Sequence, residues 1–495
     1  MAAAMEGGNS WQPGANFVAN LWREFSPALV ETGRHISWWL AFGLILAFLP
    51  YFPYSKHIHL LMGPFNFITR PTRKRWGLLA PLNFDDESIE QFGAARLTDL
   101  DQTHLVDAFA CIMCNRCQDV CPAYLTGKEL SPSALEINKR YYILENMGEL
   151  ATDGADALPL FEYAISQSAV WACTTCGACV EVCPVGNQPM VDILAMRRNQ
   201  VLMESAFPYQ LKGAFTGLER NNNPWQMSDH RLTWAGSLDF SVPTVEENPA
   251  FEVLFWVGCA GAFDPDAQKI SRAIATALNA AGVNFAVLGQ KEACTGDMAR
   301  RAGNEYLFAQ MAQKNIEILN EIGADKKRIV TGCPHCLHTL GQEYADFGGK
   351  YTVCHHTQFI AELVREGKLK LKHNISEKIT FHDPCYLGRY SREYNPPREI
   401  LAKTGAIVVE MGRAKNNSFC CGGGGAQMWK EEEKGAQAVN VNRYLEAAAA
   451  GAETLAVGCP FCGRMLKDAH TTEGIPPLKI QDVAEIVVTA IEQKG

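Results

Sequence analysis

The 495-residue sequence lacks the features of fibrous, disordered and nucleic-acid-binding proteins. Its 41 glycines and 24 prolines are close to average usage, which excludes collagen-like and low-complexity chains. The net charge is −9, so there is no general basic excess that would attract nucleic acid. The N-terminus has no signal-peptide cleavage pattern, because its apolar stretch starts far in and ends in bulky residues. The length predicts about three domains with a core that needs no disulfides.

Cysteine, by contrast, is abundant, with 18 residues. Disulfides are rare inside cells, and C-x-x-C pairs in a large intracellular protein usually bind metal or carry out redox chemistry. The sequence therefore predicts a redox or metal protein that faces the cytoplasm.

An uncharged apolar run extends from Ile36 to Ser55. Its helical part is expected over Ile36–Phe52, because Pro50 and Pro53 interrupt a helix. At about 1.5 Å per residue this helix is near the lower length limit for crossing a hydrocarbon core of roughly 30 Å. Aromatic residues at both ends suit the two membrane interfaces. The alternative is a buried core helix.

Residues 51–84 contain no acid and five basic residues: Lys56, Arg70, Arg73, Lys74 and Arg75. The positive-inside rule then places the rest of the chain in the cytoplasm. Three histidines flank the span: His35, His57 and His59. They are expected to be interfacial or capping side chains, and the alternative is that they contact a haem or a quinone. A single span cannot enclose a haem, so haem b would require a membrane partner.

Two cysteine runs have the C-x2-C-x2-C-x3-C-P spacing of bacterial two-cluster ferredoxins. In that spacing three cysteines of one run bind one [4Fe-4S] cluster and the fourth reaches the other cluster. Cluster I is therefore assigned to Cys111, Cys114, Cys117 and Cys183, and cluster II to Cys173, Cys176, Cys179 and Cys121. Structural zinc sites fit this spacing poorly, because zinc commonly takes two separated C-x-x-C pairs. Helices are expected around the runs, over 133–146, 159–170 and 187–203.

The second half of the chain contains an internal repeat with an offset of 126 residues. Four cysteines recur at this offset: Cys259, Cys294, Cys333 and Cys336 in the first copy, and Cys385, Cys420, Cys459 and Cys462 in the second. Gly332–Cys336 and Gly458–Cys462 differ only at the fourth residue, His or Phe. This pattern indicates duplication of one module.

Each copy alternates apolar strands with amphipathic helices. Strands are expected over 253–257, 284–288, 328–331, 378–381, 406–411 and 454–457, and helices near 266–281, 303–322, 396–403 and 431–449. Such alternation predicts an α/β fold with a largely parallel sheet in each copy and the cysteines near the strand ends. The predicted fold class is an α/β and α-helical mix, with an N-terminal membrane helix, a helical two-[4Fe-4S] ferredoxin-like domain and the duplicated α/β module.

The two copies differ at one cysteine, because Cys421 of the second copy corresponds to Thr295 of the first. The four cysteines of the first copy form site 1, which suits an ordinary [4Fe-4S] cluster. Site 2 has five, which suit an opened, non-cubane cluster and make it the candidate catalytic centre: Cys385, Cys420, Cys421, Cys459 and Cys462. Gly422–Gly425 allow backbone N–H groups to approach the sulfurs, and they lack the ending of a phosphate loop.

Three further side chains near these sites have a structural or a chemical role. Cys354 has Ile480 at the equivalent position and is predicted to be a buried structural thiol. His382 and Asp383 lie just before Cys385, where a proton-donor role is the alternative to a structural one.

The combination of motifs resembles the CCG-domain family, which includes heterodisulfide reductase catalytic subunits and the iron–sulfur subunits of glycolate and glycerol-3-phosphate dehydrogenases. The segments His382–Arg389, Cys294–Gly303 and Cys121–Pro132 resemble the D-type subunits of heterodisulfide reductases. Pro53–Leu60 is similar to the end of a nitrate-reductase-type cytochrome b domain. The resemblance covers about residues 35–490. Thr295 departs from the five-cysteine pattern, which implies an ordinary cluster at site 1.

In membrane-bound relatives a cytochrome b domain precedes these clusters, and some relatives pass electrons between electron-transfer flavoprotein and quinone. The resemblance therefore implies two partners: a soluble electron donor or acceptor such as electron-transfer flavoprotein, and a membrane cytochrome b-like or quinone-binding subunit. The second partner is expected because this chain has only the last span of such a domain.

Five regions are expected: a membrane-associated segment 1–75, a ferredoxin-like domain 76–206, a linker 207–252, and module copies 253–378 and 379–495. Two functions fit them. One is an electron relay between a soluble redox partner and the quinone pool, and the other is a disulfide or thiol reductase with chemistry at site 2. The five-cysteine site favours the reductase, whereas the cytochrome b-like segment favours the relay, which we prefer.

Overall fold

The computed structural model describes residues 11–69, 79–152, 157–372, 374–472, 474 and 476–491. The chain divides into two compact units, Met1–Phe65 and Asn66–Gly495. Four of the basic residues that predict the membrane orientation lie outside the described residues: Arg70, Arg73, Lys74 and Arg75.

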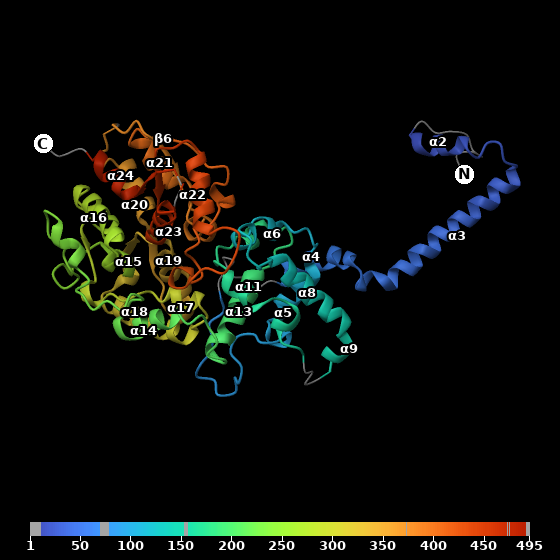
Figure 1. Cartoon of the computed structure of the whole chain (residues 1–495), viewed down its shortest axis with the longest axis horizontal. Coiled ribbons are helices and arrows are strands. Elements are labelled where there is room, and N and C mark those ends of the chain that lie inside the picture. The colour runs from blue at the N-terminus through green and yellow to red at the C-terminus, as the bar shows by residue number, and fades with distance from the viewer. Residues whose placement is uncertain are drawn as a thin grey trace. The chain divides into compact units, whose positions relative to one another are not determined.

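The N-terminal unit contains α2 (Pro13–Asn20), the long helix α3 (Pro27–Tyr51) and the first residues of α4 (His59–Thr69) (Figure 1). By length and composition α3 can cross a membrane, and none of its most apolar window is buried. The core-helix alternative therefore has no support among the described residues. The helix is longer than predicted. It begins at Pro27, which suits a first helical position, and it continues through Pro50 before a 3-10 turn at Phe52–Tyr54.

The ferredoxin runs lie in a helical region, as predicted. Its elements are α5 (Gln102–Ala110), α6 (Arg116–Asp119), α7 (Pro122–Leu125), α8 (Pro132–Glu145), α9 (Met147–Leu150), α10 (Leu160–Tyr163), α11 (Gln167–Ala172), α12 (Ala178–Val182) and α13 (Pro189–Leu202). The Ser131 hydroxyl caps α8 by accepting the Ala134 N–H at 3.1 Å. The single helix expected over 159–170 is instead α10 and α11, because Ser166 starts a new helix by accepting the Ala169 N–H.

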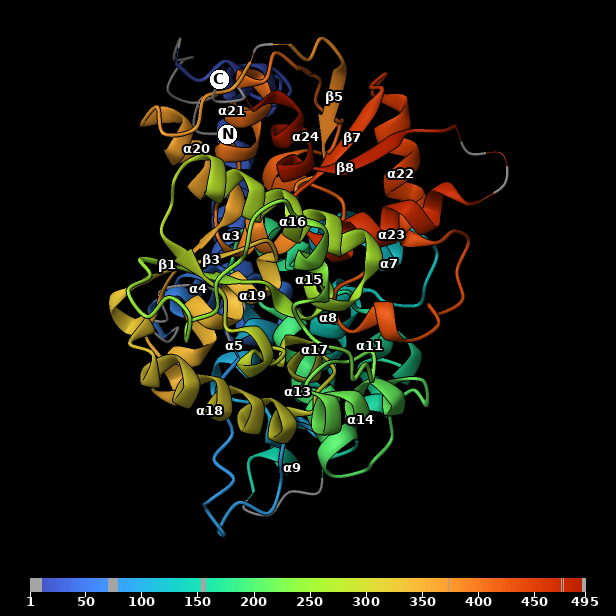
Figure 2. The same cartoon turned by 90° about the vertical axis from the view of Figure 1, so that its left-hand side faces the viewer.

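Two four-stranded parallel sheets follow, one in each copy of the module (Figure 2). The first has the order β2-β1-β3-β4 and the second the order β6-β5-β7-β8. The strands are β1 (Val253–Trp256), β2 (Phe285–Ala286), β3 (Arg328–Thr331), β4 (Thr352–His355), β5 (Lys378–Phe381), β6 (Ile407–Val408), β7 (Thr454–Val457) and β8 (Lys479–Asp482). The equal strand order confirms the predicted duplication and α/β class. The edge strands β4 and β8 were not among the predicted strands, because their polar residues hide the apolar pattern.

The two copies pack against each other with approximate twofold symmetry. Helix α16 (Pro265–Ala280) contacts α24 (Val483–Ala490), and α20 (His356–Arg365) contacts α21 (Asn395–Lys403). These contacts are reciprocal, because α16 corresponds to α21 and α20 to α24 at the 126-residue offset. His356 and Asp482 are also equivalent positions, and His356 Nε2 lies 2.9 Å from Asp482 Oδ1 in the buried interface. A pseudo-twofold axis therefore passes between these two side chains.

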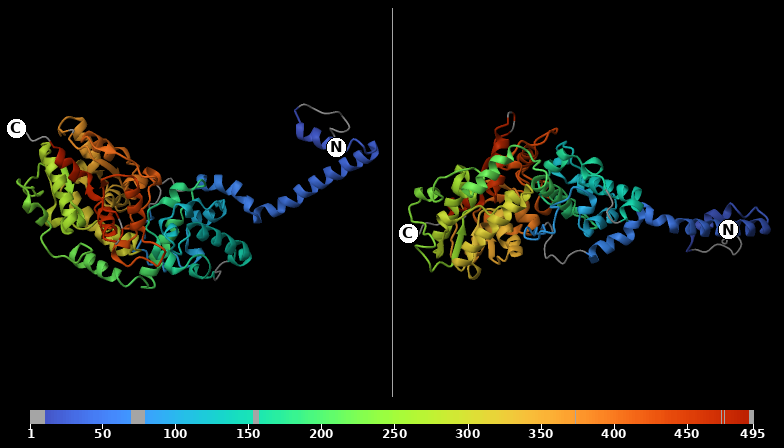
Figure 3. Two further views of the ribbon diagram at one scale, coloured as in Figure 1. Left: turned by 45° about the horizontal axis from the view of Figure 1, so that its top comes forward. Right: turned by 90° about the horizontal axis from the view of Figure 1, so that it is seen from below.

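The remaining segments cover the modules and join them to the ferredoxin-like helices, which lie together in both views of Figure 3. Residues 207–252 contain α14 (Leu211–Asn221), and Trp234 in this segment is fully buried against Phe255. The helix expected over 431–449 is the counterpart of α18 (Glu305–Glu321), but it starts only at Val439, as α22 (Val439–Ala449). The preceding residues contact the ferredoxin-like region instead, where Ala436 N–H donates to Thr126 O at 2.8 Å.

The shared core predicts a strong effect for Phe381, which is 1% exposed in a cluster formed by both copies. We expect Phe381→Ala to lower the free energy of unfolding by about 3–5 kcal/mol, because it removes buried apolar surface and leaves a cavity. Ile407→Ala is the control, because Ile407 is 52% exposed and its loss should cost below about 0.5 kcal/mol. Anaerobic denaturant unfolding measures both values, and equal effects would contradict the shared core.

Candidate metal centres

The two ferredoxin runs fold into loops with the same backbone pattern. Met113 and Asn115 in the first run, and Thr175 and Gly177 in the second, have positive φ angles of 55°, 61°, 49° and 71°. These left-handed turns point backbone donors at the thiols: Met113 N–H and Thr175 N–H each lie 3.4 Å from the sulfur two residues earlier. The loops therefore provide thiols and N–H···S hydrogen bonds in one small volume, as a cluster site requires.

The thiols of the two runs are grouped across the repeat. Burial, with Glu136 and the thiols of Cys183 and Cys114 nearby, raises the pKa of Cys111 to about 12. Burial also raises the pKa of Cys121, whose neighbouring thiols are Cys176 and Cys173 of the other run. Each last cysteine thus lies with the other run, which is the grouping that the assignments to clusters I and II require. Cys114 is exposed, whereas the four thiols of the cluster II group are buried or half-buried.

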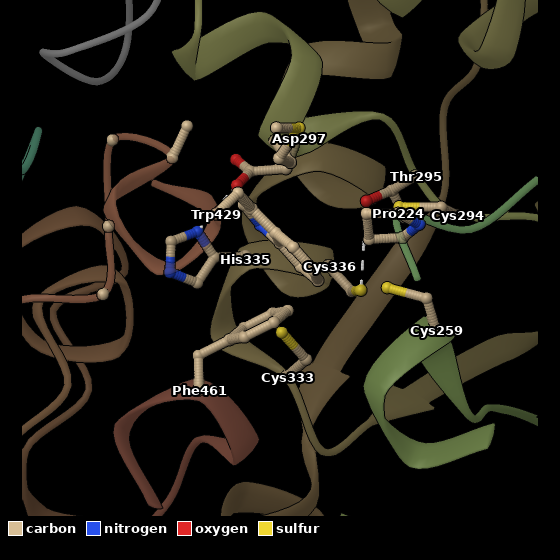
Figure 4. A pocket seen from close by; sticks show the side chains of 15 residues that line it. Pro224, Cys259, Cys294, Thr295, Asp297, Cys333, His335, Cys336, Trp429 and Phe461 are labelled. Carbon is tan, nitrogen blue, oxygen red and sulfur yellow. Dashed lines mark hydrogen bonds and ion pairs between the residues drawn. The ribbon is translucent and has the colours of Figure 1, made fainter. Parts of the chain in front are cut away.

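Site 1 is a cavity lined by Cys259, Cys294, Cys333 and Cys336 (Figure 4). All four thiols are buried, and they follow β1, β2 and β3, at the carboxyl edge of the sheet. The Thr295 hydroxyl lies 3.9 Å from Cys336 Sγ. A hydroxyl therefore occupies the place where site 2 has its fifth thiol.

A buried ion pair lies beside site 1. His335 Nδ1 is 2.8 Å from Asp297 Oδ2, and Arg301 Nε donates to Asp297 Oδ1 at 3.1 Å. Burial alone would raise the pKa of Asp297, but His335 and Arg301 outweigh it and lower that pKa. The His335 ring also stacks on Tyr386 at 3.9 Å between ring centres, which ties site 1 to the segment after Cys385.

Site 2 gathers its five thiols in the same arrangement. Cys420 lies close enough to Cys385, and Cys421 to Cys462, for the thiols of each pair to shift each other's pKa. Hydrogen bonds from Cys420 and Cys462 lower the pKa of Cys421 far below the usual value of a thiol. The Cys421–Cys462 pair corresponds to Thr295–Cys336 of site 1 at the 126-residue offset. The two sites therefore share one geometry and differ in one donor.

The four glycines after Cys421 have two separate roles. Gly422 N–H lies 3.3 Å from Cys420 Sγ and Gly423 N–H lies 3.5 Å from Cys421 Sγ, as predicted. Gly424 and Gly425 pack against the ferredoxin-like region instead, because a Cβ on either would lie 2.4 Å from the carbonyl oxygen of Thr174 or Cys173. Half of the glycine run therefore permits close contact between domains.

His382 and Asp383 have different surroundings. Asp383 accepts two hydrogen bonds of 2.8 Å from Arg398 and is held as an ion pair away from a proton-donor role. A ring nitrogen of His382 lies within 4.8 Å of the Cys421 and Cys462 sulfurs. Arg443 Nε donates to His382 Nδ1 at 3.0 Å, so a neutral ring carries its hydrogen on Nε2. In this tautomer both ring nitrogens are occupied, so His382 cannot bind a metal, and its Nε2–H, which has no partner among the described residues, is free to donate.

Two contacts between sites were missed by the sequence reasoning. Cys176 of the cluster II group lies so close to Cys420 of site 2 that each thiol shifts the pKa of the other. Cys459 of site 2 and Cys333 of site 1 are related in the same way. Cys333 and Cys459 are equivalent positions, so the duplication combined with a twofold axis could have indicated their contact. No sequence signal indicated the contact of Cys176 with Cys420.

The other candidate residues have local partners. Cys354 is buried, donates to Ile329 O at 3.7 Å, and lies outside all four thiol groups. Burial raises its pKa to about 11, as expected of a structural thiol. The histidines near α3 contact neighbours in sequence: His35 pairs with Glu31, His57 with Ser55, and His59 with the Lys56 carbonyl.

Comparisons with known proteins agree with this architecture. The "Cysteine-rich domain" family matches residues 253–341 and 379–467, and the "4Fe-4S dicluster domain" family matches residues 107–187. The probable iron–sulfur-binding oxidoreductase FadF of Bacillus subtilis is 39% identical, over 98% of this chain and 74% of that protein. This chain belongs to the CCG-domain iron–sulfur oxidoreductases.

Two further members of this family are similar over most of their length. The EtfAB:quinone oxidoreductase of Syntrophomonas wolfei is 35% identical, over 93% of this chain and 68% of that protein. The D-type subunit of the dihydromethanophenazine:CoB–CoM heterodisulfide reductase of Methanosarcina barkeri is 30% identical, over 79% of this chain and 96% of that protein.

The donor sets of this CCG-domain protein fit iron–sulfur clusters. All 18 cysteines are free thiols, 17 of them in the four groups and Cys354 apart. Structural zinc takes four ligands, so the five clustered thiols of site 2 fit it poorly. When bound, iron–sulfur clusters supply one-electron transfer, and the cysteine groups and backbone donors set their potentials.

The assignment of the last cysteine of each run to the other run's cluster predicts the effect of losing Cys183. This residue belongs to the second run, but its thiol lies with the thiols of the first run. We expect Cys183→Ser to alter the paramagnetic resonance signal of cluster I and to leave the signal of cluster II unchanged. Cys354→Ser is the control and should keep full iron content, because that thiol lies outside the groups. If Cys183→Ser alters cluster II instead, each run binds its own cluster and the assignment is wrong.

Proposed function

We propose that this protein is a membrane-associated electron relay between a soluble redox partner and the quinone pool. The observation that carries this proposal is the unbroken series of thiol groups. The cluster I group shares its two cysteine runs with the cluster II group, which contacts site 2 through Cys176 and Cys420. Site 2 contacts site 1 through Cys459 and Cys333. A series without gaps suits transfer over a distance, whereas a single catalytic centre would not need it.

The cluster I end of the series is the end that follows the membrane segment in the chain. Asn66 on α4 is buried and donates to Asp107 Oδ1 at 2.6 Å and to Val185 O at 3.2 Å. The neighbouring Asn187 N–H lies 3.2 Å from Cys183 Sγ. Asn66 thus lies beside the residues that surround a cluster I thiol, which supports electron exchange with a membrane cytochrome b-like or quinone-binding subunit at this end.

The opposite end of the series, site 1, is then the side for the soluble partner. The name of the Syntrophomonas relative combines EtfAB with quinone, which supports electron-transfer flavoprotein as that partner. The helix α3 and the basic residues after it support a membrane anchor with the cluster-bearing unit in the cytoplasm.

A disulfide or thiol reductase is the second candidate, and the fifth thiol of site 2 favours it. The heterodisulfide reductase relative carries this activity in its name. Under this alternative Cys385, Cys420, Cys421, Cys459 and Cys462 form a catalytic centre, and site 1 and the ferredoxin groups supply electrons to it.

The relay predicts the behaviour of membrane vesicles that contain the full-length protein with its membrane partner. Reduced electron-transfer flavoprotein, added without oxygen, should bleach the cluster absorbance and produce quinol. A variant lacking residues 1–58, which keeps α4 and the buried Asn66, should be soluble and still be bleached by the flavoprotein, but it should produce no quinol. Full-length protein in the soluble fraction, or clusters that stay oxidised, would contradict the relay. Oxidation of the reduced protein by glutathione disulfide or the CoB–CoM heterodisulfide would favour the reductase.

The single difference between the two sites predicts a reciprocal exchange of properties. Cys421→Thr should give site 2 the paramagnetic signature of site 1, with little loss of iron, because four thiolates still hold a [4Fe-4S] cluster. Thr295→Cys should give site 1 the signature of site 2. In the relay, Cys421→Thr slows transfer without abolishing it, and in the reductase, disulfide turnover is lost. Unchanged spectra in both variants would show that Cys421 is not a ligand.

A further inference from the structure

Arg389 is a buried cation whose hydrogen bonds all go to neutral groups. Its side chain is 2% exposed. Nε donates to Cys176 O at 2.8 Å, and Nη1 donates to Ser418 O at 2.7 Å and to Asn416 O at 3.2 Å. Among the described residues, Nη2 has no hydrogen-bond partner, and no carboxylate lies within ion-pair distance of the guanidinium.

Three other buried arginines of this protein are neutralised by acids. Arg300 pairs with Glu305 and Glu343, Arg301 pairs with Asp297 and Glu343, and Arg443 pairs with Glu446. A buried charge is costly unless an opposite charge lies nearby, and carbonyl oxygens contribute dipoles but no net charge. The surroundings of Arg389 must therefore contain an anion other than a carboxylate.

The nearest groups that can become anionic are three thiols from two different sites. Burial acts to lower the pKa of Arg389, and Cys176, Cys385 and Cys420 outweigh it and raise that pKa. Cys176 belongs to the cluster II group, and the other two belong to site 2. Arg389 follows Cys385 in the π-helical turn Tyr386–Tyr390, so the backbone fixes the guanidinium beside the junction of these sites.

We propose that Arg389 is the shared counter-charge of cluster II and site 2 and raises the reduction potential of both. This inference rests on the proposed assignment of those thiols to iron–sulfur clusters. A cluster held by thiolates is anionic and gains one further negative charge on reduction. A fixed positive charge in a dry site therefore stabilises the reduced form more than the oxidised form. The equivalent position in the first copy is Phe263. The cation that acts on the site 1 thiols Cys259 and Cys294 is Arg231, which an acid neutralises, because it pairs with Glu292 at 2.7 Å.

A second buried arginine allows the two sites to be distinguished. Arg197 is fully buried on α13 and donates to the carbonyl oxygens of Val170, Trp171, Cys173, Arg301 and Gly425. No carboxylate of the described residues lies within ion-pair distance. Cys173 of the cluster II group raises its pKa most, followed by Glu433 and Tyr386, against the larger lowering by burial. Arg197 therefore acts on cluster II but not on site 2.

The test is a redox titration of the full-length protein followed by paramagnetic resonance. Arg389→Gln should lower the equilibrium constant for one-electron reduction of both cluster II and site 2 by at least tenfold, about 59 mV each. Arg197→Gln should lower the constant of cluster II only. Arg389→Lys, which keeps the charge, should stay within threefold of the wild type. Arg392→Gln is the matched control, because Arg392 lies three residues further on and pairs with Glu181 at the surface.

The outcomes separate this inference from the proposed function. Signals that are present in Arg389→Gln with unchanged potentials would overturn the role of Arg389 and leave the relay intact. A wild type without any iron signal at site 2 would overturn both. If Arg389→Gln loses iron, the lysine variant Arg389→Lys shows whether the positive charge or the hydrogen bonds of Arg389 are required. Retained iron and potentials in the lysine variant support the charge, whereas loss of iron in both variants shows that the hydrogen-bond fork, not the charge, is required.

Discussion

The contact between Cys176 and Cys420 is the interaction on which this architecture depends. It joins a ferredoxin-like loop to the second α/β module at the point where both present buried thiols. The loop can approach this closely because Gly424 and Gly425 have no side chains to hold it away. Arg389 then fixes the same loop through the Cys176 carbonyl. Other contacts also join the two regions, such as Arg197 with the carbonyl oxygens of Arg301 and Gly425, but at this junction thiols of both regions meet.

The duplication extends this junction into a chain of four sites. Because the copies are related by a pseudo-twofold axis, equivalent residues near the axis meet each other: His356 meets Asp482, and Cys333 meets Cys459. The two module sites are thus adjacent without a dedicated linker. The two copies differ at two positions that matter for the sites. Thr295 of the first copy corresponds to Cys421 of the second, so the first copy has four thiols and the second has five. Phe263 of the first copy corresponds to Arg389 of the second.

Local patterns in the sequence predicted most of the fold. The ferredoxin spacing implies the crossed arrangement of Cys121 and Cys183, and the repeat implies two sheets of equal order. The length of α3 was underestimated at its N-terminal end, because Glu31 and Arg34 interrupt the apolar pattern between Pro27, where the helix begins, and Ile36. The contact of Cys176 with Cys420 and the position of Arg389 between sites depend on packing between distant segments. No local periodicity or spacing encodes such packing.

The central claim is that the four groups form one series in the order cluster I, cluster II, site 2, site 1. Pulsed paramagnetic resonance on partly reduced protein tests this order through magnetic coupling between the clusters. The account predicts that site 2 couples strongly to cluster II and to site 1, and that coupling between cluster I and site 1 is the weakest of all pairs. Stronger coupling of cluster II to site 1 than to site 2 would contradict the order and the junction at Cys176 and Cys420.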